Sequence, residues 1–276
     1  MEFTKMQGLG NDFVVIDGVT RPAQLSRDEI HWLADRRFGI GCDQVLVAEP
    51  ATDPSADFRY RIYNADGGEV EHCGNGVRCL ARFVQRQGLA GPGELCFQTS
   101  HGLTRVTTNA AGTVTVDMGP PVLDPAAIPF NAAERAATYR LAAAGEDWTI
   151  GAVSMGNPHA VVTVDAVETA PVASLGPRIE DHDAFPNRVN VGFMAVLDAH
   201  RIRLRVYERG AGETLACGTG ACAAVVAGRL RGLLADEVAV ELPGGELMIH
   251  WGGDNEPVLM TGPAVTVFTG ETAPSN

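Results

Sequence analysis

The alternation of apolar and polar residues predicts short strands with one prominent helix among them. Residues 58–63 alternate apolar and basic side chains, which is typical of a half-exposed strand. A series of strands joined by turns is predicted over residues 95–118. Between these strands, residues 77–87 have the spacing of an amphipathic helix, which Gly88 ends. The first part of the chain is therefore predicted to mix strands with a helix that follows the strand at 58–63.

Upstream of this helix, the pattern predicts two further strands and one capped helix. The strands are predicted at residues 14–17 and 44–48, where apolar residues cluster. Between them, Ser26 and Glu29 stand at the spacing of a capping box, which predicts a helix that begins there and runs to about Arg37.

The same order of elements begins again after Gly119-Pro120-Pro121, the best candidate for a domain boundary. A helix of small residues is predicted over 221–230. Around it the pattern predicts strands at residues 148–153, 160–164, 189–196, 202–207, 238–242, 246–251, 258–260 and 265–268.

A direct comparison of the two halves reveals an internal duplication. Residues 61–76 and 205–220 share seven identities at a constant offset of 144 residues, and both segments end in Cys-Gly-x-Gly. A second match in nearly the same register links Gly10-Asn11 with Gly156-Asn157. Repeats in the same order with little drift predict two similar α+β domains.

Composition and charge exclude several classes of function. The 276 residues are 45 % apolar and 20 % charged, with a formal net charge of −13 and no cluster of Lys and Arg. Such a chain repels phosphate backbones, so neither nucleic acid nor an anionic membrane is an expected partner. There is no apolar run of roughly 20 residues and no secretory signal, so we expect a cytoplasmic protein.

The six cysteines do not have the spacing of a zinc site, and a cytoplasmic chain of this length keeps them reduced. In the two Cys-Gly-x-Gly segments, glycine permits a tight turn before the helix that follows. A helix N-terminus attracts anions and lowers the pKa of a thiol to roughly 3.5–7.5. We therefore expect a substrate carboxylate to bind the backbone around Gly74-Asn75 and Gly218-Thr219.

The duplication of this thiol indicates proton transfer at a carbon atom. If Cys73 and Cys217 lie on opposite sides of one Cα, a thiolate on one face removes its proton while a thiol on the other face delivers one. The centre is then inverted. The remaining cysteines are interpreted as small buried apolar residues: Cys42, Cys79, Cys96 and Cys222.

The sequence resembles the diaminopimelate epimerase family almost from end to end. The resemblance is carried by an ordered set of motifs, which are intact throughout: Gly8-Leu9-Gly10-Asn11-Asp12-Phe13, Gly39-Ile40-Gly41-Cys42-Asp43-Gln44, Tyr63-Asn64-Ala65-Asp66-Gly67, Cys73-Gly74-Asn75-Gly76-Val77-Arg78-Cys79, Met155-Gly156-Asn157-Pro158-His159, Arg188-Val189-Asn190-Val191, Tyr207-Glu208-Arg209-Gly210 and Ala216-Cys217-Gly218-Thr219-Gly220.

The resemblance implies an isomerase that converts LL- into meso-2,6-diaminopimelate without a cofactor or a metal. This reaction supplies lysine and peptidoglycan precursors. It also implies a homodimer and two pseudo-symmetric domains, each a β-sheet or barrel wrapped around a central helix. The first domain comprises residues 1–118 and 263–276, because the last strand returns to it, and the second comprises residues 119–262.

The resemblance also assigns roles within the site. Cys73 and Cys217 are implied to be the catalytic pair, with Cys217 accepting the proton from the LL isomer and Cys73 donating one. Two neighbours, His159 and Glu208, are expected to tune the thiol pKa values, the first as an imidazolium. Substrate contacts are expected from Asn11, Gln44, Asn64, Gly74, Asn75, Asn157, Asn190, Glu208, Arg209, Gly218 and Thr219.

Three other functions remain open from the residues alone. A two-thiol racemase for proline or hydroxyproline would share the fold, but Arg209 and the many Asn residues favour a substrate with a distal polar end. A single-cysteine acyl-transfer enzyme could use His72 beside Cys73, although Ala216 stands at the matching place beside Cys217. The third alternative is a binding protein without catalysis.

Overall fold

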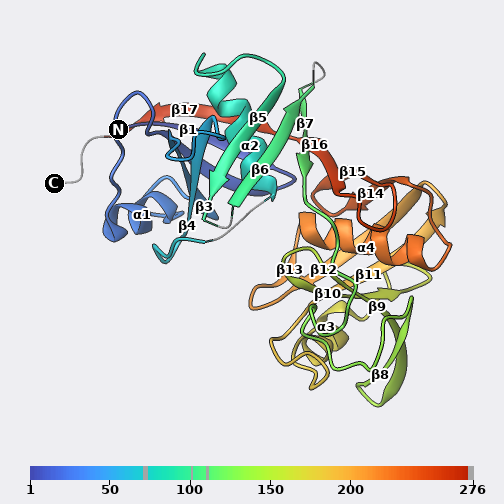
Figure 1. Cartoon of the computed structure of the whole chain (residues 1–276). Coiled ribbons are helices and arrows are strands. Elements are labelled where there is room, and N and C mark those ends of the chain that lie inside the picture. Colours follow the sequence, from blue (N-terminus) through green and yellow to red (C-terminus); the bar gives the residue numbers. More distant parts are fainter. Residues whose placement is uncertain (71–73, 101, 110–111, 273–276) are drawn as a thin grey trace. The chain divides into compact units, whose positions relative to one another are not determined.

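The computed structural model describes residues 1–70, 74–100, 102–109 and 112–272 (Figure 1). The chain divides into two compact units. Unit 1 comprises residues 1–117 together with 261–276, and unit 2 comprises residues 118–260.

Unit 1 is a curved sheet with two helices. Its elements are β1 (Glu2–Gly8), β2 (Asn11–Asp17), α1 (Arg27–Ala34), β3 (Gln44–Pro50), β4 (Phe58–Asn64), α2 (Gly74–Arg86), β5 (Glu94–Thr99), β6 (Gly102–Thr108), β7 (Thr113–Asp117) and β17 (Val265–Glu271). The strands pair in the order β17-β1-β2-β3-β4-β5-β6-β7. The pairs β2/β3 and β4/β5 are parallel, and the other pairs are antiparallel.

Unit 2 repeats this topology. Its elements are β8 (Tyr139–Ala143), β9 (Glu146–Ser154), β10 (Pro158–Thr163), α3 (Val172–Glu180), β11 (Asn190–Asp198), β12 (Arg201–Glu208), β13 (Gly212–Thr214), α4 (Gly218–Leu230), β14 (Glu237–Leu242), β15 (Gly245–Trp251) and β16 (Val258–Pro263), whose last residues belong to unit 1. The strands pair in the order β8-β9-β10-β11-β12-β14-β15. As in unit 1, two of these pairs are parallel, here β10/β11 and β12/β14, and the other pairs are antiparallel.

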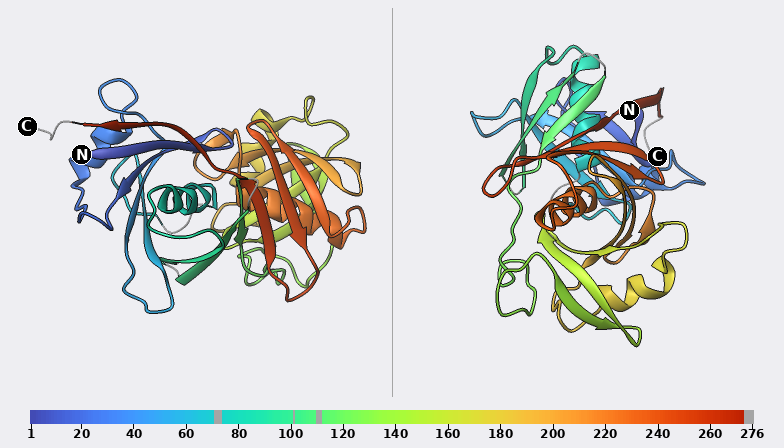
Figure 2. Two further views of the ribbon diagram at one scale, coloured as in Figure 1. Left: turned by 90° about the horizontal axis from the view of Figure 1, so that it is seen from above. Right: turned by 90° about the vertical axis from the view of Figure 1, so that its right-hand side faces the viewer.

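Within each unit the strands wrap around one central helix, α2 in unit 1 and α4 in unit 2 (Figure 2, left). Residues 74–81 of α2 are all buried, and so are residues 220–228 of α4. Such helices need small residues where a strand approaches closely. A Cβ atom on Gly76 would lie 2.1 Å from the Tyr60 hydroxyl of β4. The predicted amphipathic helix is therefore buried on all sides over its first turns, because the sheet encloses it.

The predicted α+β class, duplicated around two central helices, is confirmed. The predicted capping box is also confirmed at α1. The Ser26 backbone N–H donates to Glu29 Oε2 at 2.8 Å, and the Glu29 N–H donates to Ser26 Oγ at 3.2 Å. Both bonds satisfy helix-terminal donors that would otherwise lack a partner.

Candidate active site

Cys217 is the N-cap residue of α4, and its side chain is buried with a residue exposure of 4 %. Its Sγ lies 3.5 Å from Thr219 Oγ1, and the nearby Gly220 backbone N–H acts to lower the pKa of the thiol. Gly220 leaves the necessary space, because a Cβ atom there would come within 3.3 Å of Sγ. The thiol thus lies against the first turn of a helix, where backbone N–H groups and the helix dipole stabilise a thiolate.

Glu208, the last residue of β12, acts on the same thiol in the opposite sense. Burial raises the pKa of Cys217 well above its ordinary value, and the charge of Glu208 and a hydrogen bond to its carboxylate raise it further. Glu208 is itself held by Thr214 of β13, whose Oγ1 donates to Oε1 at 2.6 Å.

The surroundings of Cys217 therefore contain groups that favour each protonation state. Burial and Glu208 favour the thiol, whereas Thr219, Gly220 and the helix N-terminus favour the thiolate. The thiol is the form that donates a proton. For Cys217 to accept a proton, as the resemblance implies for the LL isomer, it must first lose its own, and the Glu208 carboxylate is an adjacent acceptor.

Glu208→Gln is expected to lower the pKa of Cys217, because the amide removes the negative charge that opposes the thiolate. The limb of the kcat/KM–pH profile that reports Cys217 should move to lower pH, and profiles measured in both reaction directions would show it. Glu213→Gln is the matched control, since Glu213 pairs with Arg205 at 2.6 Å. Profiles that coincide for the wild type and Glu208→Gln would refute the tuning role of Glu208.

His159 lies on β10 with an exposure of 1 %, and its Nε2 is 3.0 Å from Asn157 Oδ1. Burial lowers the pKa of His159 to about 3, with a further contribution from the charge of Arg209. The ring is therefore neutral at pH 7, which corrects the expected imidazolium. Within the described part of the chain, Nδ1 has no hydrogen-bond partner. Because Nε2–H donates to Asn157 in this neutral ring, Nδ1 carries the lone pair and can accept a hydrogen bond.

Asn190 lies beside His159, because the two residues pair in the β10/β11 register. Asn190 Nδ2 donates to Pro158 O at 3.0 Å, and its Oδ1 accepts from the Arg209 backbone N–H at 2.9 Å. The Arg209 side chain is exposed and donates through Nη1 to Asn187 O at 2.9 Å. The site residues predicted in unit 2 are thus gathered at one end of β10–β12 and the start of α4.

Glu180, at the end of α3, supports this group, although no motif of the sequence predicts its role. Its exposure is 3 %, and Oε1 accepts from the Gly210 N–H at 2.7 Å and from Arg188 Nη2 at 2.6 Å. It therefore fixes the turn that follows Arg209. The apolar pattern gave no signal for it, since α3 was not predicted.

In unit 1 the predicted residues also come together, at the ends of β2–β4 and the start of α2. Gln44 Nε2 donates to Asn64 Oδ1 at 2.9 Å across the β3/β4 pair. Asn75 Nδ2 donates to Asn11 Oδ1 at 3.4 Å. Gly74 is the first residue of α2. Cys73, the predicted catalytic partner, lies outside the described residues, as does His72.

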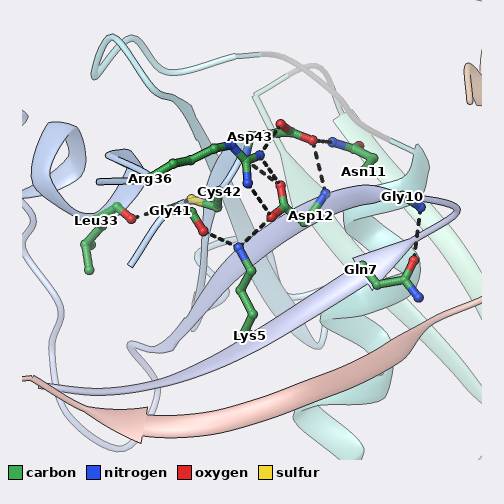
Figure 3. Close-up of polar contacts among 10 residues, drawn as sticks. All are labelled: Lys5, Gln7, Gly10, Asn11, Asp12, Leu33, Arg36, Gly41, Cys42 and Asp43. Atoms are coloured by element: carbon green, nitrogen blue, oxygen red, sulfur yellow. Dashed lines mark hydrogen bonds and ion pairs between the residues drawn. The ribbon is translucent and has the colours of Figure 1, made fainter. Parts of the chain in front are cut away.

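An ion-pair network lies beside Asn11, and no local sequence pattern predicts it (Figure 3). Asp12 accepts from Lys5 Nζ at 2.6 Å and from two nitrogens of Arg36 at 3.0 and 2.7 Å. Arg36 also contacts Asp43 at 2.7 Å. Burial opposes the charge of Asp12, but hydrogen bonds and charges from Arg36 and Lys5 outweigh it and lower the Asp12 pKa to about 2.

Metal-ligand groups and membrane-spanning helices were sought among the described residues. These residues contain no group of three or more His, Cys, Asp or Glu side chains placed to hold a metal ion. None of the helices in this part of the chain combines the length and the apolar character needed to cross a membrane.

The fold places the chain in a class of structures that includes amino-acid epimerases. A crystal structure of a hydroxyproline epimerase from Agrobacterium vitis, with bound trans-4-hydroxy-L-proline, superposes with a TM-score of 0.68. The match covers 98 % of this chain and 91 % of that one at 18 % identity, which shows the fold alone.

Similarity of sequence to known proteins shows to which family the chain belongs. The profile of the family described as "Diaminopimelate epimerase" matches residues 3–123 and 151–267. A diaminopimelate epimerase from Alkalilimnicola ehrlichii is 64 % identical over 273 residues, covering 98 % of each chain. One from Thioalkalivibrio sulfidiphilus is 61 % identical over 272 residues, again covering 98 % of each. This chain belongs to the diaminopimelate epimerase family.

Proposed function

We propose that this isomerase inverts one α-carbon of LL-2,6-diaminopimelate to give the meso isomer, a step toward lysine and peptidoglycan precursors, without a cofactor. The observation that carries the proposal is the environment of Cys217. A buried thiol at a helix N-terminus has neighbours that stabilise the thiolate, Thr219 and Gly220, and a neighbour that favours the thiol, the Glu208 carboxylate. Such a thiol can exist in both states that an acid–base catalyst must adopt.

In the proposed reaction Cys73 and Cys217 act on opposite faces of one Cα. The thiolate of one cysteine takes the Cα proton and becomes a thiol. The thiol of the other donates its proton to the opposite face and becomes a thiolate. The bond to hydrogen is thus broken on one face and formed on the other, and the pair ends with its protonation states exchanged. Hydrogen bonds from the N-terminal turns of α2 and α4 to the substrate carboxylate stabilise the carbanion between these steps.

The polar residues near the two helix starts are proposed to hold the rest of the substrate. Arg209 binds the distal carboxylate through its planar fork, and Glu208 pairs with an ammonium group. The neutral ring of His159 accepts a hydrogen bond from the substrate through Nδ1. The other proposed contacts are the amides and backbone groups of Asn11, Gln44, Asn64, Gly74, Asn75, Asn157, Asn190, Gly218 and Thr219.

The proposed function is tested by incubating the enzyme with LL-diaminopimelate and with L-proline under reducing conditions and separating the stereoisomers by chiral chromatography. Formation of meso-diaminopimelate, with L-proline unchanged, is the expected result. Racemisation of proline without conversion of diaminopimelate would instead favour the proline-type alternative, which has the shared fold in its support.

We also propose a homodimer, supported by the apolar surface of β17. Val265 and Val267 are 43 % and 55 % exposed, although both lie in a strand that pairs with β1. Sedimentation velocity should show a dimer that Val267→Glu converts to a monomer, because a buried unpaired carboxylate is costly. The control is Phe38→Glu, at an 82 % exposed residue in the turn that follows α1. A dimer that survives Val267→Glu would exclude this surface, and a monomeric wild type would exclude the dimer.

The proposed location is the cytoplasm, where the thiols remain reduced. Cell fractionation with an antibody to the chain tests this location, and recovery of the protein outside the cytoplasmic fraction would contradict it.

A further inference from the structure

We infer that Asp43 and Arg78 are positioning residues that fix the direction of the Asn11 and Asn75 side-chain amides in the substrate site. The inference rests on the proposed function, in which these amides contact diaminopimelate. Four side chains form one continuous hydrogen-bonded chain from the core of unit 1 to its surface: Arg78, Asn75, Asn11 and Asp43.

The bonds of this chain all run in the same direction. Arg78 Nη2 donates to Asn75 Oδ1 at 2.9 Å, and Asn75 Nδ2 donates to Asn11 Oδ1 at 3.4 Å. Asn11 Nδ2 then donates to Asp43 Oδ2 at 2.9 Å, as Figure 3 shows. Each amide therefore presents its oxygen toward the interior and its nitrogen toward Asp43.

The chemistry of the two ends determines this direction. A guanidinium only donates hydrogen bonds, and an ionised carboxylate only accepts them. If Asn75 were reversed, its NH₂ group would face the donors of Arg78. If Asn11 were reversed, its carbonyl oxygen would face the carboxylate of Asp43. An amide between two neutral hydroxyl groups could adopt either orientation, whereas these two amides can adopt only one.

Both ends are held in place by the backbone and by other charges. Asp43 Oδ1 accepts from Arg36 Nη2 at 2.7 Å, and its Oδ2 accepts from the Asp12 backbone N–H at 3.1 Å. Arg78 is fully buried and donates through Nε to Pro263 O at 3.2 Å. Gly8 of β1 leaves room for it, since a Cβ atom there would lie 3.2 Å from Arg78 Nη2.

The second half of the chain shows that packing alone does not require a charged residue in this helix. At the offset of 144 residues, Cys222 of α4 corresponds to Arg78, and Thr219 corresponds to Asn75. Cys222 is fully buried, so the same fold encloses its central helix with a small apolar residue at this position. Burying a cation is costly unless its donors are used. At these two positions, Arg78 and the Asn75 amide that it orients therefore occur in unit 1 alone, where Asn75 is a proposed substrate contact.

Asp43→Asn tests the inference in the full-length enzyme, because an amide at this position can donate as well as accept and no longer fixes Asn11. Asp43 has a side-chain exposure of 45 %, so the variant is expected to fold. KM for LL-diaminopimelate should rise by about 10-fold, comparable to the loss of one charge-assisted hydrogen bond, with kcat nearly unchanged. Asp254→Asn, which removes the negative charge that pairs with Arg135 at 2.9 Å in unit 2, is the matched control and should leave KM unchanged.

A double-mutant cycle with Asn11→Ala separates positioning from general stability. If Asp43 acts through Asn11, adding Asp43→Asn to Asn11→Ala should leave KM as it is in Asn11→Ala alone. An equal increase of KM in both backgrounds would overturn the inference, and so would an unchanged KM in the single Asp43→Asn variant. A wild-type enzyme that does not epimerise diaminopimelate would instead refute the proposed function, so the two failures are distinguishable.

Discussion

Replacing Cys217 by alanine is expected to slow the conversion of LL- into meso-diaminopimelate by about 100- to 10,000-fold, the usual contribution of one general acid or base. The thiol lies at the start of α4 between Glu208 and Thr219, and no other described cysteine shares this environment. In the proposed reaction, the variant has no group to exchange a proton on one face of the Cα atom. Initial rates measured by chiral chromatography, with substrate at saturation, would give the change in kcat.

The matched control is Cys222→Ala, which alters a second buried cysteine on the same helix. This variant should be less stable, because it removes a buried sulfur atom, but it should retain nearly the wild-type rate at a temperature where it is folded. If Cys217→Ala were as active as Cys222→Ala, Cys217 would be a packing residue and the catalytic assignment would fail.

Arg209→Lys is expected to raise KM for diaminopimelate by about 10- to 100-fold, which corresponds to the loss of one hydrogen bond to a charged group. Lysine retains the positive charge but loses the planar fork that binds a carboxylate through two parallel bonds. The backbone of Arg209 is held by Asn190 at 2.9 Å, so the substitution should leave the turn in place. Steady-state kinetics with LL-diaminopimelate would measure the effect.

A substrate that lacks the distal carboxylate tests the proposal that Arg209 binds this group. L-Lysine should be a poor substrate for the wild type, and its KM should not be higher for Arg209→Lys than for the wild type. The matched control is Arg203→Lys on β12, the strand that precedes Arg209, where Arg203 pairs with Glu241 at 3.0 Å. A KM for diaminopimelate that is equal in Arg209→Lys and Arg203→Lys would show that Arg209 does not bind the substrate.

Features with a local cause could be predicted from the sequence. The capping box at Ser26 and Glu29 involves residues three positions apart, so its pattern is legible in the sequence. The strand at 58–63 has the alternation of a half-exposed sheet and forms β4. The duplicated Cys-Gly-x-Gly segments, at a constant offset, predicted two similar α+β domains, and α2 and α4 begin at the equivalent residues Gly74 and Gly218.

Features with a long-range cause could not be predicted. Helix α3 begins after Pro171 and contains Pro177, a residue that usually indicates the end of a helix, and no side chain caps its first turn. The network of Lys5, Asp12 and Arg36 joins three segments that only the folded sheet brings together. Such contacts depend on tertiary packing, and no local pattern encodes them.

The protonation of His159 is a third feature of this kind. Its position in the Met155–His159 motif indicated a role in the site, but the charge of the ring depends on burial. An exposure of 1 % and the nearby charge of Arg209 lower its pKa to about 3, so the ring is neutral.

The isotope content of the first product formed in heavy water tests the central claim, two thiols acting on opposite faces of one carbon. The enzyme is equilibrated in ²H₂O and mixed with protiated LL-diaminopimelate, and both isomers are analysed by mass spectrometry at low conversion. Two thiols predict one deuterium at the inverted carbon of each meso molecule, while the recovered LL isomer stays protiated. Meso product that retains protium at that carbon would contradict the account, because a single group would then have returned the same proton.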